Sequence, residues 1–129
     1  MATYDQLMVY KTSYDLTVEV MRLSKKLPRE LRFTLGERVI NSTVEMMISI
    51  YRVNIEQANK FDKLGIAREE LETLRLLVRI IKDLQYVSVA YFTTLSEMIE
   101  SISKQLTAWH RSVKAPVSKG TGSTPSLFQ

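Results

Sequence analysis

The chain has 129 residues, which fits a single domain, and its net charge is +4 from 18 Lys and Arg against 14 Asp and Glu. With no Cys and one His, it excludes a disulfide scaffold, a thiolate zinc site, an iron–sulfur cluster, a thiol nucleophile and a multi-His metal cage. Only four Gly disfavour a sheet-rich fold with many tight turns and a glycine-rich phosphate loop.

The first segment, about residues 5–26, carries apolar side chains at intervals of three, four and seven, which is the period of an α-helix. They form two rows: Leu7, Tyr14, Val18 and Met21; and Val9, Leu16, Val20, Leu23 and Leu27. Pro28 should end this helix, because the residue before a proline is disfavoured in the helical region.

The second segment is predicted to begin at a capping box, Thr34 with Glu37, and to continue as a helix to about Asn59. Its two apolar rows are Leu35, Val39, Met46 and Ile50; and Ile40, Val44, Met47, Tyr51 and Ile55. We expect the next break at Gly65.

The third segment has the most regular pattern, with spacings of three and four that predict a helix. Its main row is Leu64, Ala67, Leu71, Leu74, Val78 and Ile81, beside a second row of Leu77, Ile80, Leu84 and Val87. Residues 85–88 form the third break, with Ser88 as a candidate N-cap for the following helix.

The fourth segment continues the pattern to Val113. Its row is Val89, Phe92, Leu95, Ile99, Ile102, Leu106, Trp109 and Val113. From Ala115 the composition changes to Pro, Gly, Ser and Thr, so we divide the chain into a helical domain, residues 1–114, and a flexible tail, residues 115–129.

Four helices with short connections predict an all-α fold, an antiparallel up-down-up-down four-helix bundle. The second apolar rows in the first three segments exceed what one helix face needs. They could thicken the core of a monomer, or they could meet another subunit. We favour the second interpretation and expect an oligomer.

The sequence has few residues or motifs suited to catalysis or cofactor binding. His110 is the single histidine, there is no Gly-x-Ser-x-Gly elbow, and the Glu-x-x-His pair of a di-iron bundle is absent. We therefore expect no enzyme, no metal and no cofactor. Met8 and His110 could ligate haem in such a bundle, which leaves a redox carrier as a distant alternative.

Basic residues cluster in two stretches that an up-down bundle would bring to the same end. The candidate nucleic-acid-binding residues are Arg22, Lys25, Lys26, Arg29, Arg32, Arg75, Arg79 and Lys82. Together they predict a basic cap that binds phosphate backbones without base specificity. Two further interpretations remain: the cap could be neutralised by Glu19, Glu30 and Asp83, or Arg75 and Arg79 could pair with carboxylates of a neighbouring subunit.

Four blocks in order carry a family resemblance: LPRELRFTLGERV, IYRVNIEQANK, REELETLRLLVRIIKDL and ISKQLTAWHRSV. They resemble the accessory variability determinant (Avd) proteins of diversity-generating retroelements. These belong to a wider four-helix-bundle family that includes proteins encoded in intervening sequences of bacterial large-subunit ribosomal RNA. The matching positions include Arg29, Arg32, Arg75 and Arg79, whereas Lys25, Lys26 and Lys82 come from charge placement alone.

The resemblance implies a homopentameric barrel of basic protomers that binds a reverse transcriptase and nucleic acid and supports mutagenic retrohoming. We therefore expect a non-enzymatic accessory protein whose partners are a reverse transcriptase, RNA or DNA, and further copies of itself in a pentamer. The N-terminus shows no signal peptide and no membrane span is evident, so we expect a cytoplasmic protein without a membrane partner. Two different functions stay open: an intervening-sequence protein associated with ribosomal RNA, and a purely structural oligomerisation module.

Overall fold

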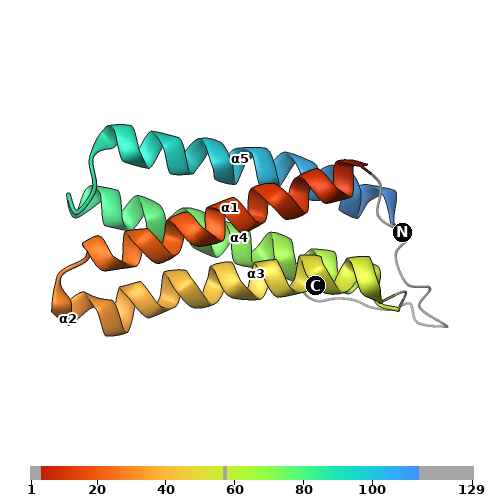
Figure 1. Ribbon diagram of the computed structural model, residues 1–129, viewed down its shortest axis with the longest axis horizontal. Helices are drawn as coiled ribbons and strands as arrows, with labels where there is room; N and C mark the ends of the chain where they lie inside the picture. Colours follow the sequence, from red (N-terminus) through yellow and green to blue (C-terminus); the bar gives the residue numbers. More distant parts are fainter. Residues whose placement is uncertain (1–3, 57, 114–129) are drawn as a thin grey trace, which may run out of the picture.

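The protein consists of four long helices with short connections, as a computed structural model describes it for residues 4–56 and 58–113 (Figure 1). The long helices are α1 (Tyr4–Lys26), α3 (Glu37–Ile55), α4 (Lys60–Asp83) and α5 (Val89–Ser112). Between α1 and α3 lie a short helix, α2 (Arg29–Leu31), and a π-helical turn, η1 (Arg32–Gly36). The described residues contain no strand, which confirms the all-α prediction.

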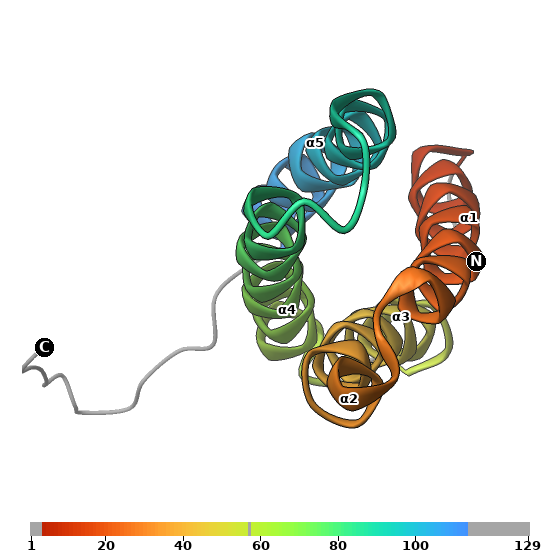
Figure 2. The same cartoon turned by 90° about the vertical axis from the view of Figure 1, so that its left-hand side faces the viewer.

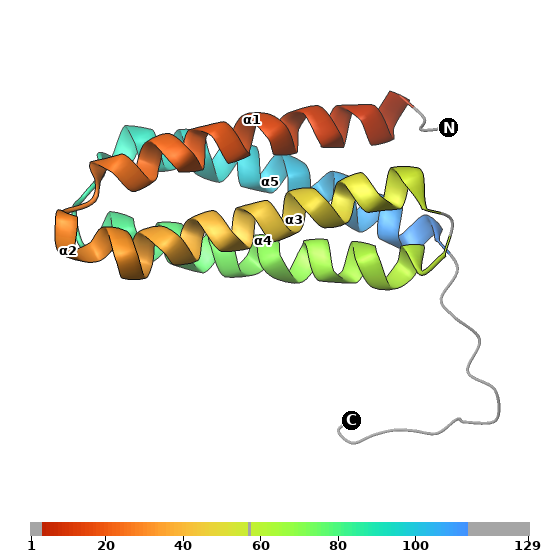
Figure 3. The ribbon, with the colours of Figure 1, turned by 60° about the horizontal axis from the view of Figure 1, so that its bottom comes forward.

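The helices run antiparallel in an up-down-up-down arrangement, each beside the one before it in the chain (Figures 2 and 3). The circle closes where α5 packs beside α1. One end of the bundle carries α2, η1, the ends of α1 and α4 and the starts of α3 and α5 (Figure 1). We call this end the α2 pole and the other end the opposite pole.

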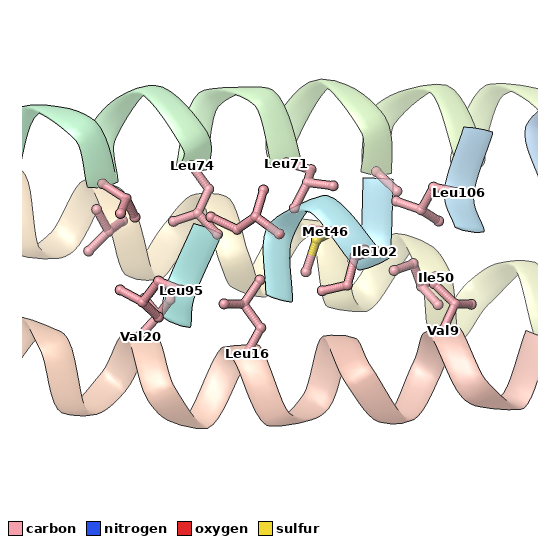
Figure 4. Close-up of a cluster of buried hydrophobic side chains, with 14 of the residues drawn as sticks. Val9, Leu16, Val20, Met46, Ile50, Leu71, Leu74, Leu95, Ile102 and Leu106 are labelled. Atoms are coloured by element: carbon pink, nitrogen blue, oxygen red, sulfur yellow. The ribbon is translucent and has the colours of Figure 1, made fainter. Parts of the chain in front are cut away.

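The core is a continuous column of aliphatic side chains contributed by all four long helices (Figure 4). It contains one of the two rows predicted for the first segment and the main row of the third, including Leu16, Leu23, Leu71 and Leu74, each at most 1% exposed. Since burying each such side chain stabilises the fold by about 1.5–3 kcal/mol, this column is the main source of stability.

The predicted capping box at Thr34 is wrong. The chain is already helical from Arg29, and α2, η1 and α3 follow one another without a break. The Thr34 hydroxyl donates to the carbonyl oxygen of Leu31 at 3.3 Å instead of capping a helix. The first break is where Pro28 predicts it, with ψ of 152° at that residue.

The predicted break at Gly65 is also wrong, because Gly65 lies inside α4. The chain turns earlier, between Ile55 and Lys60, where Asn59 adopts the left-handed conformation with φ of 61°. Asn enters this region more readily than most residues, so Asn59 supplied a turn signal that a search for glycine missed.

The connection between α4 and α5 follows the sequence prediction more closely. Ser88 is the N-cap of α5, and its hydroxyl accepts a hydrogen bond from the backbone N–H of Tyr91 at 3.0 Å. Helix α4 ends in a Schellman motif, with Tyr86 N–H donating to Ile81 and Gln85 N–H to Lys82. Gln85 takes the left-handed position, with φ of 67°.

The proposed tail, residues 115–129, lies outside the described residues. Across residues 4–56 and 58–113, no helix is both long and apolar enough to cross a membrane.

Candidate nucleic-acid interface

The α2 pole gathers most of the predicted cations from two distant stretches of the chain. Seven belong to the segments that meet there: Arg22, Lys25, Lys26, Arg29, Arg32, Arg79 and Lys82. Arg75 lies two turns further back on α4, about 12 Å from the end of that helix at 1.5 Å per residue. Helix C-termini favour positive charge, so the dipoles of α1 and α4 account for part of this placement.

Two adjacent aromatic residues at the start of α5 link the two basic stretches. The ammonium nitrogen of Lys26 lies 5.1 Å from the centre of the Tyr91 ring, and that of Lys82 lies 4.9 Å from the Phe92 ring. These cation–π contacts hold both lysines against α5 without neutralising their charge. The sequence analysis did not assign this role to Tyr91 and Phe92.

Glu19 fixes the seam between α1 and α5 close to the α2 pole. One carboxylate oxygen accepts the Tyr91 hydroxyl at 2.8 Å, and the other pairs with Arg22 at 3.2 Å. Burial, followed by the hydrogen bond to Glu19, raises the pKa of the Tyr91 phenol above its ordinary value, so it remains a donor. Arg22 is thus partly neutralised within its own subunit.

Arg32 folds back onto the backbone at the end of α1. Its guanidinium donates to the carbonyl oxygens of Leu27 at 3.1 Å and Lys25 at 3.2 Å. Carbonyls at a helix C-terminus lack partners within the helix, and a cation there also complements the helix dipole. The main role of Arg32 is therefore to cap the C-terminus of α1 and to hold it against η1.

Arg79 and Lys82 share one carboxylate, that of Asp83, at 4.0 Å and 3.2 Å. The Arg79 contact is at the outer limit of an ion pair, and its side chain is 72% exposed. An exposed pair of this kind contributes about 0–1 kcal/mol, so Arg79 can exchange Asp83 for a phosphate at little cost.

Among the candidate cations of the pole, Lys25 and Arg29 form no polar or cation–π side-chain contact with the rest of the described chain. Both are exposed, and neither side chain forms a hydrogen bond or ion pair with any residue in the described part of the chain. The nearby carboxylates Glu30 and Glu37 form no ion pair with either of them. Neutralisation by acidic neighbours therefore applies to Arg22 and, weakly, to Arg79 and Lys82.

Arg75 has a different environment from the other candidates. It pairs with Glu72 of its own helix at 3.1 Å and with Glu100 of α5 at 2.8 Å. The hydrogen bond to Glu100 is the main cause that raises the pKa of Arg75, and the same bond lowers the pKa of Glu100. Arg75 thus ties α4 to α5 inside one subunit.

His110 lies near the opposite pole, beside a shallow groove between α4 and α5 lined by Gly65, Arg68 and Ser103. Its Nδ1 lies 2.9 Å from a guanidinium nitrogen of Arg68, and its Nε2 lies 3.0 Å from the carbonyl oxygen of Phe61. Since arginine can only donate, Nδ1 accepts and Nε2 carries the proton. Both ring nitrogens are engaged, so ligation of haem by His110 would break one of these bonds.

Comparison with known proteins identifies the family. Residues 7–113 match the family described as bAvd-like. The chain belongs to the bAvd-like family.

The fold recurs in the crystal structure of a protein of unknown function from the S23 ribosomal protein family of Bacteroides thetaiotaomicron. The TM-score is 0.77 at 18% sequence identity, over 84% of this chain and 99% of that one. No curated protein sequence matches the chain.

This bAvd-like chain also exposes apolar side chains along the seam between α1 and α3. Tyr10 and Tyr51 mark the seam, with ring centres 6.3 Å apart. Exposed side chains one turn or more from these two lie on the same side of their helices. We call this surface the outer α1/α3 face; it comprises Leu7, Tyr14, Met21, Ile48, Tyr51 and Ile55, between 37% and 58% exposed.

The outer α1/α3 face shows where one of the two apolar rows of α1 lies. Leu7, Tyr14 and Met21 belong to that row, and all three are exposed. They do not thicken the core, because the row of Val9, Leu16 and Val20 fills it from the other side of the helix. Exposed apolar side chains that line up on one face, rather than being scattered singly, are typical of a surface that meets another protein.

Proposed function

We propose that this protein is a non-enzymatic accessory factor of a diversity-generating retroelement. It binds RNA or DNA through the α2 pole and binds the reverse transcriptase through another face, and so supports mutagenic retrohoming. The observation that carries this proposal is the position of Lys25 and Arg29, two exposed cations without acidic partners in the described chain, within a pole that also holds Lys26, Arg79 and Lys82.

The mechanism is scaffolding by a rigid surface. Ammonium and guanidinium groups bind phosphate oxygens and release counterions, which gives affinity without base specificity and a strong dependence on salt. Lys25, Arg29, Lys26, Arg79 and Lys82 form the proposed contact set. Arg22, Arg32 and Arg75 support it through their intramolecular contacts.

Self-assembly through the outer α1/α3 face is part of the proposal. A homo-oligomer, with the pentamer of the Avd proteins as its expected form, would bury this face and would carry one α2 pole per subunit. The repeated poles would increase the positive potential that attracts a polyanion.

A double charge reversal tests the contact set. Lys25→Glu with Arg29→Glu should weaken binding of RNA and DNA, lower the salt slope of log K by about 1.5 for two lost phosphate contacts, and abolish retrohoming. Fluorescence anisotropy over a range of salt concentrations measures both effects on binding.

The matched control is Lys104→Glu with Arg111→Glu, which makes the same change in net charge on exposed positions of α5 away from the α2 pole. Equal losses in the two double variants would mean that total charge, and not the α2 pole, determines binding. Circular dichroism checks that both variants fold.

Co-purification with the reverse transcriptase tests the second partner. A complex that survives nuclease treatment supports direct contact, and one that disappears shows that nucleic acid bridges the two proteins. If neither polymerase nor nucleic acid co-purifies, the protein is a structural oligomerisation module instead.

A role with ribosomal RNA is the second candidate, and the shared fold with an S23-family protein favours it over a purely structural role. Sequencing of the RNA that co-purifies from the native host separates it from the retroelement function. Template-repeat transcripts support the retroelement, whereas enrichment of large-subunit ribosomal RNA supports the second candidate.

A further inference from the structure

Phe33 is the most exposed large apolar side chain of the described residues, with 73% of its surface accessible. Leaving a phenylalanine in water forgoes about 1.5–3 kcal/mol of hydrophobic stabilisation. It lies in η1 at the α2 pole, within the stretch that also holds Arg29 and Arg32. Packing within the subunit does not explain why an aromatic ring is exposed to solvent among these cations.

The backbone of η1 presents Phe33 to solvent. Leu31 and Leu35 on either side pack against the core, and Gly36 is buried. With those positions facing inward, Phe33 is left on the outer side of the turn. π-helical turns are rare, and many of them occur at functional sites.

Arg29 and the end of α1, which carries Lys25, lie beside the turn that holds Phe33. Arg29 precedes it by four residues in a continuous helical stretch, a spacing that places Cβ atoms about 6 Å apart on one side of a helix. The hydrogen bond from Arg32 to the Lys25 carbonyl, at 3.2 Å, holds the end of α1 beside η1 and so keeps Lys25 near.

We propose that Phe33 stacks on an unpaired base of single-stranded RNA or DNA, while Lys25 and Arg29 hold the adjacent phosphates. This inference rests on the proposed function and adds that the bound nucleic acid is single-stranded. In a duplex the faces of the bases are covered by their neighbours, so only an unstacked base can lie against the ring. Stacking on an aromatic side chain tolerates every base, which agrees with a site that reads no sequence.

The charge around Phe33 argues for a nucleic acid and against a two-fold symmetric contact between copies of the chain. A symmetric contact between copies through Phe33 would bring Lys25 and Arg29 of each copy together and would be disfavoured by repulsion. A polyanion meets the same cations favourably.

The test compares Phe33→Ala with the wild type on single strands and on duplexes. We expect Phe33→Ala to weaken binding of a short single-stranded RNA, and of the DNA of the same sequence, by about 5- to 100-fold. Duplex affinity should not change, and neither should the salt slope, because the ring releases no counterions. Leu76→Ala, which removes an exposed apolar side chain from α4, is the matched control and should change nothing.

Phe33→Trp should retain single-strand affinity and also report stacking directly. The wild-type chain has one tryptophan, Trp109, near the opposite pole, so quenching that appears only in the Phe33→Trp protein places a base on residue 33. The proposal predicts this quenching with single strands and not with duplexes.

Three other results of these binding experiments would overturn the inference, and one of them would also overturn the proposed function. Wild-type protein that binds neither single strands nor duplexes overturns both this inference and the proposed function. Binding that Phe33→Ala leaves intact, or reduces equally for single strands and duplexes, overturns this inference alone. A Phe33→Ala protein with altered mass in light scattering and unchanged binding assigns Phe33 to an assembly contact, which also overturns it.

Discussion

Arg29 and Arg32 are three residues apart and carry the same charge, yet the structure gives them different roles. Arg32 donates both of its observed hydrogen bonds to carbonyls at the end of α1, whereas Arg29 forms none within the described residues. A basic residue after a helix is consistent with either role. The geometry of the turn at Pro28 decides which guanidinium reaches the free carbonyls.

Gly65 is a single residue whose replacement should stabilise the fold. Its position inside α4 costs about 1 kcal/mol relative to alanine, and an added Cβ would lie 3.9 Å from the nearest atoms, those of the His110 ring. Gly65→Ala should therefore raise the free energy of unfolding by about 1 kcal/mol in urea titrations.

Gly36→Ala is the control for Gly65→Ala. There a Cβ would lie 3.4 Å from the Leu31 carbonyl oxygen and 3.5 Å from a Leu27 methyl group, so the gain should be smaller. A loss of stability in Gly65→Ala would contradict this prediction, because it would mean that the added methyl group clashes with the His110 ring.

At the scale of the elements, α5 joins the two basic helix ends. Its first turn carries Tyr91 against Lys26 of α1 and Phe92 against Lys82 of α4. Further along, Glu100 pairs with Arg75 of α4. The α2 pole therefore depends on the register of α5 as well as on the cations themselves.

The Arg75–Glu100 pair gives a pH prediction. Arg75 lowers the pKa of Glu100 below its ordinary 4.5 in the folded protein, so the pair stabilises the fold above that pH and loses its effect as pH falls through the lowered pKa. The stability difference between wild type and Glu100→Gln should be largest at neutral pH and should shrink below pH 4.5. High salt should reduce it too, because both groups are exposed enough to be screened.

Glu97→Gln serves as the control for Glu100→Gln. Glu97 is an exposed carboxylate on the same helix and forms no ion pair within the described chain. A stability difference for Glu100→Gln that is the same at about pH 3 and at neutral pH would contradict the assigned pairing.

At the scale of the whole molecule, the outer α1/α3 face and the α2 pole are separate surfaces, to which the proposal assigns assembly and nucleic-acid binding respectively. The face is an apolar strip along the side of the bundle, and the pole is a cationic surface at one end. Assembly through the side leaves the end free for a ligand. This division is consistent with an oligomer that binds a polyanion through repeated poles.

Charges placed on this strip test the assembly. Tyr14→Glu with Tyr51→Glu should dissociate the oligomer without unfolding the subunit, because both side chains are half exposed in it, at 56% and 50%. Size-exclusion chromatography with light scattering measures the mass, and circular dichroism measures the fold.

Ala108→Glu, on an exposed position of α5, is the control and should leave the assembly intact. A wild-type protein that is already monomeric near its 14.9 kDa chain mass would contradict the predicted assembly.

The sequence alone determined the number of long helices, the apolar rows from which the core is drawn, the break at Pro28 and the Ser88 cap, because each depends on neighbours within one or two turns. It also determined that two basic stretches share a pole, since short connections force consecutive helices to run antiparallel. Tertiary structure decided the rest. The Arg22–Glu19 pair lies within one turn of α1, but the hydrogen bond that Glu19 accepts from Tyr91, 72 residues away, depends on how α5 packs. Which α1 row faces solvent depends on where α3 packs, and a helical period cannot distinguish a row that meets the core from one that meets water.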